Sequence, residues 1–73
     1  MNKYAIDYLT NEERRYMYIV ESKLSKEDFE RNIERSFQNN KYCNFRVFVS
    51  GKIRKGTLFK VDIKRYCIYE ILD

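Results

Sequence analysis

Apolar side chains that recur at every second position are the feature that most constrains the fold of this sequence. Residues 3–9 and 15–22 alternate in this way, and so do residues 43–49, 57–63 and 66–72. A period of two is typical of strands with one buried face, because successive side chains of a strand point to opposite sides of the sheet. The pattern therefore predicts five strands.

Two of these segments leave an alternative open. Residues 12–20 include good helix formers, so a helix competes with the second strand, although the Tyr-Met-Tyr-Ile-Val run favours a strand. The dipeptide Lys64-Arg65, which joins the last two segments, is poor turn chemistry. One long bent strand is therefore the alternative to two separate ones.

Between the second and third strands, apolar residues recur at every fourth position: Phe29, Ile33 and Phe37. This spacing gives one narrow apolar stripe along a helix. Ser25 is a suitable N-cap, because its hydroxyl accepts a hydrogen bond from a free amide of the first turn. The pattern predicts a helix over residues 26–39.

Together these elements predict a single α+β domain over residues 1–73. It would be a two-layer fold, in which one helix packs on an antiparallel sheet in the order β-β-α-β-β-β. A chain of this length buries only about 60% of its unfolded surface, so we expect a modest core.

The pairing of the last hairpin follows from the requirement that paired residues share a face. Matching the apolar faces pairs Val49 with Thr57 and leaves residues 50–56 as a long loop. A tight two-residue turn would instead set Val47 opposite Arg54 and bring a charge to the core face. We therefore predict the long loop.

Charge is concentrated in residues 41–65, which carry eight basic side chains and one acid, whereas the whole chain has a formal charge of +4. Such a field attracts an anionic partner. The chain has no histidine and no phosphate-binding or nucleophile motif, and its carboxylate pairs are typical of a solvated surface. We expect no enzyme activity, no catalytic residue, no metal and no cofactor.

The two cysteines, Cys43 and Cys67, match no metal-ligand spacing. They are typical of reduced core residues in a cytoplasmic protein, and a disulfide between them is the alternative. The sequence shows no signal peptide and no membrane-spanning run, so we expect a cytoplasmic protein without a membrane partner.

The predicted loop is the first candidate site. It places three cations around the exposed apolar side chain of Ile53, at the tip of a hairpin. Such a tip reaches into a phosphate-lined groove or inserts Ile53 into a pocket on an acidic protein. The alternative is a solvated loop whose charges only aid solubility.

The second candidate is the outward face of the same hairpin. The predicted register places Tyr42, Asn44, Arg46 and Phe48 opposite Lys64, Asp62, Lys60 and Leu58. Aromatic and basic residues on one sheet face are typical of surfaces that hold single-stranded nucleic acid. The alternative is that Phe48 and Leu58 cover a dimer contact or a small core of their own.

The third candidate is a stripe of tyrosines on one face of the first hairpin, formed by Tyr4, Tyr8, Tyr16 and Tyr18. Tyrosine is enriched at protein interfaces, so the stripe suggests a partner or self-association into a homodimer. The alternative is that these residues are the core side of the sheet.

These patterns predict a set of partner-binding residues, all with basic or apolar side chains and most of them in or near the last hairpin. They are Arg46, Phe48, Lys52, Ile53, Arg54, Lys55, Lys60, Lys64 and Arg65, with Tyr42, Tyr16 and Tyr18 as secondary candidates.

In its short length, its lack of proline and its abundance of Lys, Asn, Tyr and Ile, the chain resembles small accessory proteins of phages and mobile elements in low-GC bacteria. Anti-CRISPR inhibitors are one such group. The resemblance implies an inhibitor that acts in the host cytoplasm on a defence complex or another nucleic-acid-handling complex, by protein–protein contact. DNA-mimicking inhibitors are acidic, so a basic chain implies contacts with acidic parts of its target or away from the nucleic-acid groove. The alternative is a small RNA- or DNA-binding domain that uses residues 41–65.

Overall fold

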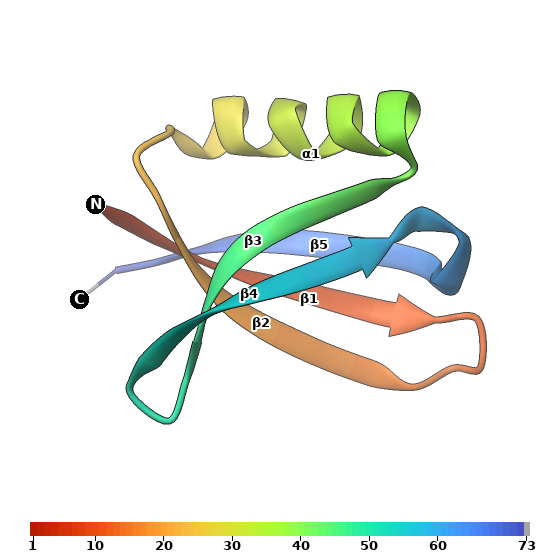
Figure 1. Cartoon of the computed structure of the whole chain (residues 1–73), viewed down its shortest axis with the longest axis horizontal. Helices are drawn as coiled ribbons and strands as arrows, with labels where there is room; N and C mark the ends of the chain where they lie inside the picture. Colours follow the sequence, from red (N-terminus) through yellow and green to blue (C-terminus); the bar gives the residue numbers. More distant parts are fainter. Residues whose placement is uncertain (73) are drawn as a thin grey trace.

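A computed structural model describes residues 1–72 of the chain. The elements are β1 (Asn2–Thr10), β2 (Arg15–Ser22), α1 (Lys26–Asn40), β3 (Tyr42–Val49), β4 (Lys52–Phe59), the short 3₁₀ helix η1 (Lys60–Asp62) and β5 (Ile63–Ile71). The five strands form one antiparallel sheet in the order β4-β3-β2-β1-β5, with α1 lying across one face (Figure 1). Within the described residues, no helix combines the length and the apolar character needed to cross a membrane.

The predicted class, an α+β two-layer domain in the order β-β-α-β-β-β, is wrong as a description of this molecule. The protein is mostly sheet, with 58% of its residues in strands, and η1 stands between the last two strands. The helix contributes Phe29, Ile33 and Phe37 to the core, and the other buried core residues come from strands. A single short helix covers only part of a five-stranded face, so the twisted strands themselves enclose much of the apolar surface.

The helix forms as its sequence predicts. The Ser25 hydroxyl accepts a hydrogen bond of 3.3 Å from the amide of Asp28, and the three apolar residues of the stripe are buried. The helix ends at Asn40, one residue later than predicted. Lys41 follows in the left-handed conformation, with φ of 64°, and donates its amide to the carbonyl of Phe37.

The first hairpin also confirms its prediction, and the competing helix over residues 12–20 is wrong. Tyr4 pairs with Val20, and Tyr8 pairs with Tyr16, so the tyrosines share the face that carries the core. Tyr4 is fully buried, and its ring stacks on Phe29 with 4.7 Å between the ring centroids. The interpretation of the stripe as the core side of the sheet therefore holds for Tyr4.

The predicted long loop over residues 50–56 is wrong. Ser50 and Gly51, with φ of 52° and 75°, make a two-residue turn, and Val49 pairs with Lys52. Val47 does lie opposite Arg54, as a tight turn requires. This pairing does not bring a charge into the core, because β4 is an edge strand and Arg54 stays exposed there.

The last segments face the other way from their prediction. Leu58 is buried, whereas Phe59 is half exposed and Val61 is 77% exposed in η1. In β5, Ile68 faces the core and Cys67 is exposed on the opposite face. The predicted apolar face of Cys67, Tyr69 and Ile71 is therefore wrong, because β5 leaves the β4 side of the sheet and pairs with β1.

The two cysteines lie on opposite sides of the sheet, so both are free thiols. Cys43 is buried on the helix side, and this burial raises the pKa of its thiol. The reduced state that the sequence predicts fits this placement.

Candidate functional site

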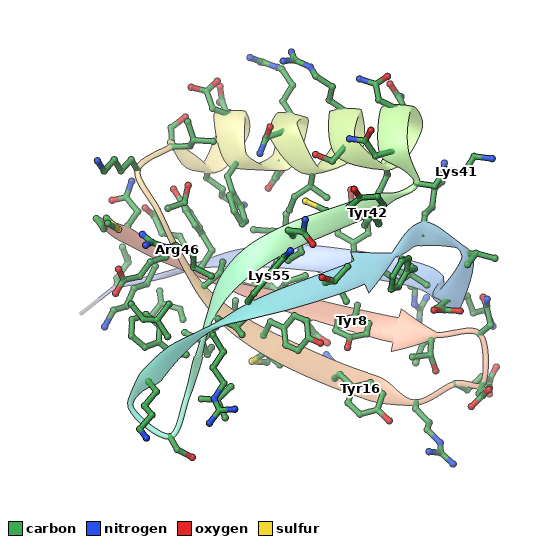
Figure 2. All side chains as sticks on the ribbon, in the orientation of Figure 1. Tyr8, Tyr16, Lys41, Tyr42, Arg46 and Lys55 are labelled. Carbon is green, nitrogen blue, oxygen red and sulfur yellow. The ribbon has the colours of Figure 1, made fainter. Side chains whose placement is uncertain are left out.

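The outer face of the β3–β4 hairpin carries the strongest concentration of binding chemistry. Alternate residues of β3 are buried toward α1, so the others point away from the helix. The pairing sets four residues of each strand side by side on this face. We call these eight residues the hairpin platform: Tyr42 with Phe59, Asn44 with Thr57, Arg46 with Lys55, and Phe48 with Ile53. Figure 2 shows Tyr42, Arg46 and Lys55 along the hairpin.

Two cations occupy the middle of the hairpin platform. Arg46 and Lys55 are exposed and directly opposite each other in the register. Like charges in this position destabilise a sheet. Among the described residues, neither side chain forms an ion pair with a carboxylate. Within residues 1–72 the two cations thus have no carboxylate at ion-pair distance, although Glu21 of β2 lies on the same face. An anionic group from a partner would stabilise the pair.

Aromatic side chains lie at both ends of the basic pair. Tyr42 and Phe59 pack with ring centroids 6.1 Å apart at an angle of 48°, and they are 41% and 50% exposed. At the other end, the ammonium of Lys3 lies 5.6 Å from the centre of the Phe48 ring. This contact adds a third cation from β1 to the same surface.

A hydrogen bond holds the strands together between the aromatic pair and the basic pair. The Thr57 hydroxyl lies 2.7 Å from the Asn44 side-chain oxygen, to which it donates. The amide nitrogen of Asn44 stays available as a donor, because its oxygen is the atom already bonded. The hairpin platform therefore alternates between aromatic, polar and basic pairs.

The structure brings some of the predicted site residues together and separates others. Arg46, Phe48, Ile53, Lys55 and the secondary candidate Tyr42 share the hairpin platform. The remaining predicted residues lie elsewhere: Lys52 and Arg54 on the other face of β4, Lys60 in η1, and Lys64 and Arg65 in β5. Lys64 also pairs with Glu13, with 3.2 Å between its Nζ and the carboxylate.

The predicted partners across the hairpin are wrong for all four positions of β3. Leu58 belongs to the main core, so it does not cover a separate small core with Phe48. The prediction missed Phe59, Thr57 and Lys3 as members of this surface. A two-residue turn at Ser50-Gly51 is the signal that identifies the first two, because it fixes the register of the whole hairpin.

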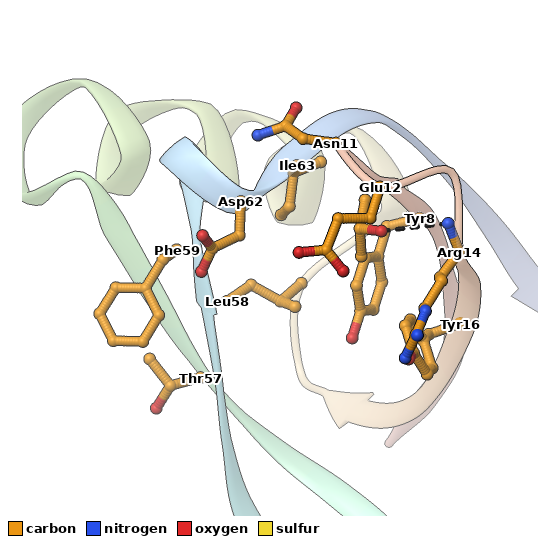
Figure 3. A pocket seen from close by; sticks show the side chains of 11 residues that line it. Tyr8, Asn11, Glu12, Arg14, Tyr16, Thr57, Leu58, Phe59, Asp62 and Ile63 are labelled. Atoms are coloured by element: carbon orange, nitrogen blue, oxygen red, sulfur yellow. Dashed lines mark hydrogen bonds between the residues drawn. The ribbon is translucent and has the colours of Figure 1, made fainter.

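A second candidate site lies at the tip of the first hairpin. It is a pocket of about 380 Å³ between β1, β2, the end of β4 and η1 (Figure 3), which we call the tyrosine pocket. Its lining includes Tyr8, Tyr16, Glu12, Arg14, Leu58 and Asp62. The hairpin tip is held to η1 by the backbone N–H of Asn11, which donates to the backbone carbonyl of Asp62 at 3.1 Å.

The tyrosines of the stripe differ in their surroundings. Tyr8 is half-buried, and its ring meets the rings of Tyr16 and Tyr18 at 5.7 and 5.5 Å. Burial and a hydrogen bond with Tyr18 both raise the pKa of Tyr8, so its phenol is neutral at physiological pH. Tyr16 is 45% exposed at the tyrosine pocket.

An ion pair between the buried carboxylate of Asp7 and the exposed side chain of Arg15 lies on the outer face of the sheet, away from the hairpin platform. Asp7 is 7% exposed, and its carboxylate accepts a hydrogen bond of 2.9 Å from Nε of Arg15. This bond and the guanidinium charge hold the pKa of Asp7 below its ordinary value. The pair is satisfied internally, which gives it a structural role. Within residues 1–72, no three His, Cys, Asp or Glu side chains gather as a metal site would require.

No family model, no curated protein and no solved structure matches the chain.

Proposed function

We propose that this chain is a non-enzymatic binding protein that holds single-stranded nucleic acid on the hairpin platform. The observation that supports this most is the opposed pair Arg46 and Lys55, which forms no ion pair with any other described residue and lies between aromatic side chains. Phosphates supply the missing negative charge, and exposed bases stack on aromatic rings. The stacking is tolerant of sequence, because every base has a π-face.

The dimensions of the hairpin platform suit a short stretch of one strand. From Tyr42 to Phe48, β3 runs about 20 Å, at ~3.3 Å per residue. That length corresponds to about six stacked nucleotides at ~3.4 Å each, and to fewer when the strand is extended. Arg46 lies four strand residues from Tyr42, about 13 Å at ~3.3 Å per residue. A base stacked on Tyr42 and Phe59 would therefore place phosphates a few nucleotides further along the strand near Arg46 and Lys55.

An inhibitor that acts by protein contact is the second candidate, and a different observation favours it. At the tip of the hairpin, Val49 and Ile53 are 49% and 52% exposed, beside the cations of β4. Exposed apolar side chains ringed by basic ones are suited to an acidic protein surface. The resemblance to phage and mobile-element inhibitors supports a host defence or nucleic-acid-handling complex as the target.

Both candidates lead to the same cellular setting. The partner would be a nucleic acid or a host complex in the cytoplasm, or the host cytoplasm for a phage-encoded chain, with no membrane involved. Self-association into a homodimer would be visible as a change of mass in solution.

The test is to titrate the protein into fluorescently labelled single-stranded RNA, single-stranded DNA and duplex DNA over a series of salt concentrations, and to follow anisotropy. We expect single strands to bind more tightly than the duplex, with a log–log salt slope of about −0.7 for each phosphate contact. Binding that is equal for duplex and single strands, or that vanishes below physiological salt, would overturn the nucleic-acid proposal and leave the protein-contact candidate.

A further inference from the structure

The tyrosine pocket differs from the hairpin platform in the sign of its local charge. The two carboxylates that line it, Glu12 and Asp62, have no ion-pair partner among the described residues. Arg14 is the cation of the lining, so these three groups sum to −1. Figure 3 shows the carboxylates of Glu12 and Asp62 among the side chains that line the pocket. In a chain of net charge +4, this local negative charge selects a cationic ligand.

The walls of the pocket suit a particular kind of cation. The rings of Tyr8 and Tyr16 form one side, and Leu58 and Ile63 supply apolar surface next to them (Figure 3). Aromatic faces attract cations, and apolar surface covers the methylene stem of a long basic side chain. A volume of about 380 Å³ is at the small end of the range for ligand pockets, which suits one side chain better than a large ligand.

We propose that the tyrosine pocket binds an arginine side chain presented by a partner peptide. A guanidinium is planar, so it stacks on a tyrosine ring while its N–H groups donate to a carboxylate in a forked pair. Glu12 and Asp62 are the acceptors, and Tyr8 and Tyr16 are the stacking surface. The pocket lining shares Thr57 and Phe59 with the hairpin platform. The groups that would bind arginine are nevertheless different from those that would hold phosphates, so the two proposals can be tested separately.

Substituting Arg14 should change the affinity for arginine in the opposite direction from substituting the carboxylates. Its guanidinium lines the same pocket, so it repels an incoming arginine and partly neutralises the carboxylates. Replacing Arg14 by Gln should therefore strengthen binding, whereas Glu12→Gln and Asp62→Asn should weaken it. A purely structural role for these exposed residues would not produce changes of opposite direction.

The experiment is an NMR titration of the ¹⁵N-labelled protein with the capped tripeptide acetyl-Gly-Arg-Gly-amide. The control ligand is the same peptide with citrulline, which keeps the shape of arginine and removes its charge. We expect amide shifts concentrated at the tyrosine pocket and a dissociation constant raised about two- to fivefold by Glu12→Gln or Asp62→Asn, the range of an exposed ion pair. Arg14→Gln should lower that constant.

A matched control variant is Glu27→Gln, which removes a carboxylate from the first turn of α1, far from the pocket in the sequence. It should leave the dissociation constant unchanged, and the amide spectrum of each variant reports directly that it is folded. Equal shifts with the citrulline peptide, the same weakening from Glu27→Gln, or shifts spread over the helix carboxylates would each overturn the proposal. The Arg46→Ser variant should bind the arginine peptide normally, so failure of nucleic-acid binding and failure of this site are distinguishable.

Discussion

At the scale of single residues, Gly56 decides how the last hairpin packs. It is buried opposite Phe45, and a Cβ at this position would lie 2.9 Å from Cγ1 of Val47. The missing side chain lets the neighbouring strand and the ring of Tyr18 approach closely. An edge strand that carries three cations in its first half can therefore still close the core in its second half.

We predict that Gly56→Ala destabilises the protein by about 1–3 kcal/mol, the usual cost of overpacking. Thermal and urea unfolding of the variant would measure this loss. In a Val47→Ala background the clashing methyl groups are absent, so the added cost of Gly56→Ala should largely disappear. The same cost in both backgrounds would show that the contact with Val47 is not the cause.

Asp7 makes a second prediction, on the pH dependence of stability. Because Arg15 lowers the folded-state pKa of Asp7 below its ordinary value of 3.8, the contribution of this pair is complete above that value. It is lost as the pH falls through the folded-state pKa. The melting temperature should therefore fall more steeply in acid for the natural chain than for Asp7→Asn, as calorimetry between about pH 5 and pH 2 would show. Parallel curves for the two proteins would contradict this assignment.

At the scale of elements, the turn between β3 and β4 sets the register of the hairpin. Ser50 and Gly51 both have positive φ, as in the mirror-image turns that favour Asn-Gly. Glycine adopts this conformation without strain, whereas serine does so at some cost. The turn therefore has the conformation that suits a two-residue hairpin, but serine is not the best residue for its first position.

We predict that Ser50→Asn stabilises the hairpin by about 0.5 kcal/mol or more, because asparagine tolerates the left-handed conformation. Ser50→Val is the control of opposite sign, since a β-branched residue with positive φ is strained. Chemical denaturation measures both. If both substitutions had the same sign, the turn conformation described here would be incorrect.

The same elements show what the sequence predicts and what it leaves open. Period-four apolar residues predicted α1, and alternation predicted the tyrosine face of β1 and β2, because in both cases the buried positions carry large side chains. In β4 the inward positions are Gly56 and Leu58, followed by the exposed Phe59. Because glycine has no side chain, it gives no sign that its face of the strand is buried. The alternation therefore predicted that Thr57 and Phe59, rather than Gly56 and Leu58, face the core.

The members of the hairpin platform could be predicted only where the alternation of a strand is clear. Tyr42, Arg46 and Phe48 were predicted to share a face because the alternation of β3 is unambiguous. Phe59 and Thr57 were missed because their membership depends on the register of β4. Lys3 was missed because it comes from β1, which β2 separates from the hairpin. The tyrosine pocket joins three separate parts of the chain around Asn11 and η1, and no local pattern in the sequence announces it.

At the scale of the whole molecule, the basic segment of the sequence is divided between two faces of the sheet. Arg46 and Lys55 lie on the hairpin platform, while Lys52 and Arg54 point to the other side of β4. The net charge of the segment alone therefore cannot distinguish a specific surface from general attraction. The structure offers two pairs of cations, close in sequence and equal in charge, that separate these explanations.

The measurement that tests the account most directly compares the double variants Arg46→Ser/Lys55→Ser and Lys52→Ser/Arg54→Ser in binding to single-stranded RNA over a salt series. Both lose two charges. The first should lose most of the affinity and flatten the log–log salt slope by about 1.4, which corresponds to two phosphate contacts, and the second should retain a steeper slope. The Arg46→Ser/Lys55→Ser variant should also be slightly more stable than the natural chain, because it removes a like-charge pair.

An equal loss of affinity and slope in both double variants would contradict the central claim, since it would mean that net charge rather than the hairpin platform attracts the nucleic acid.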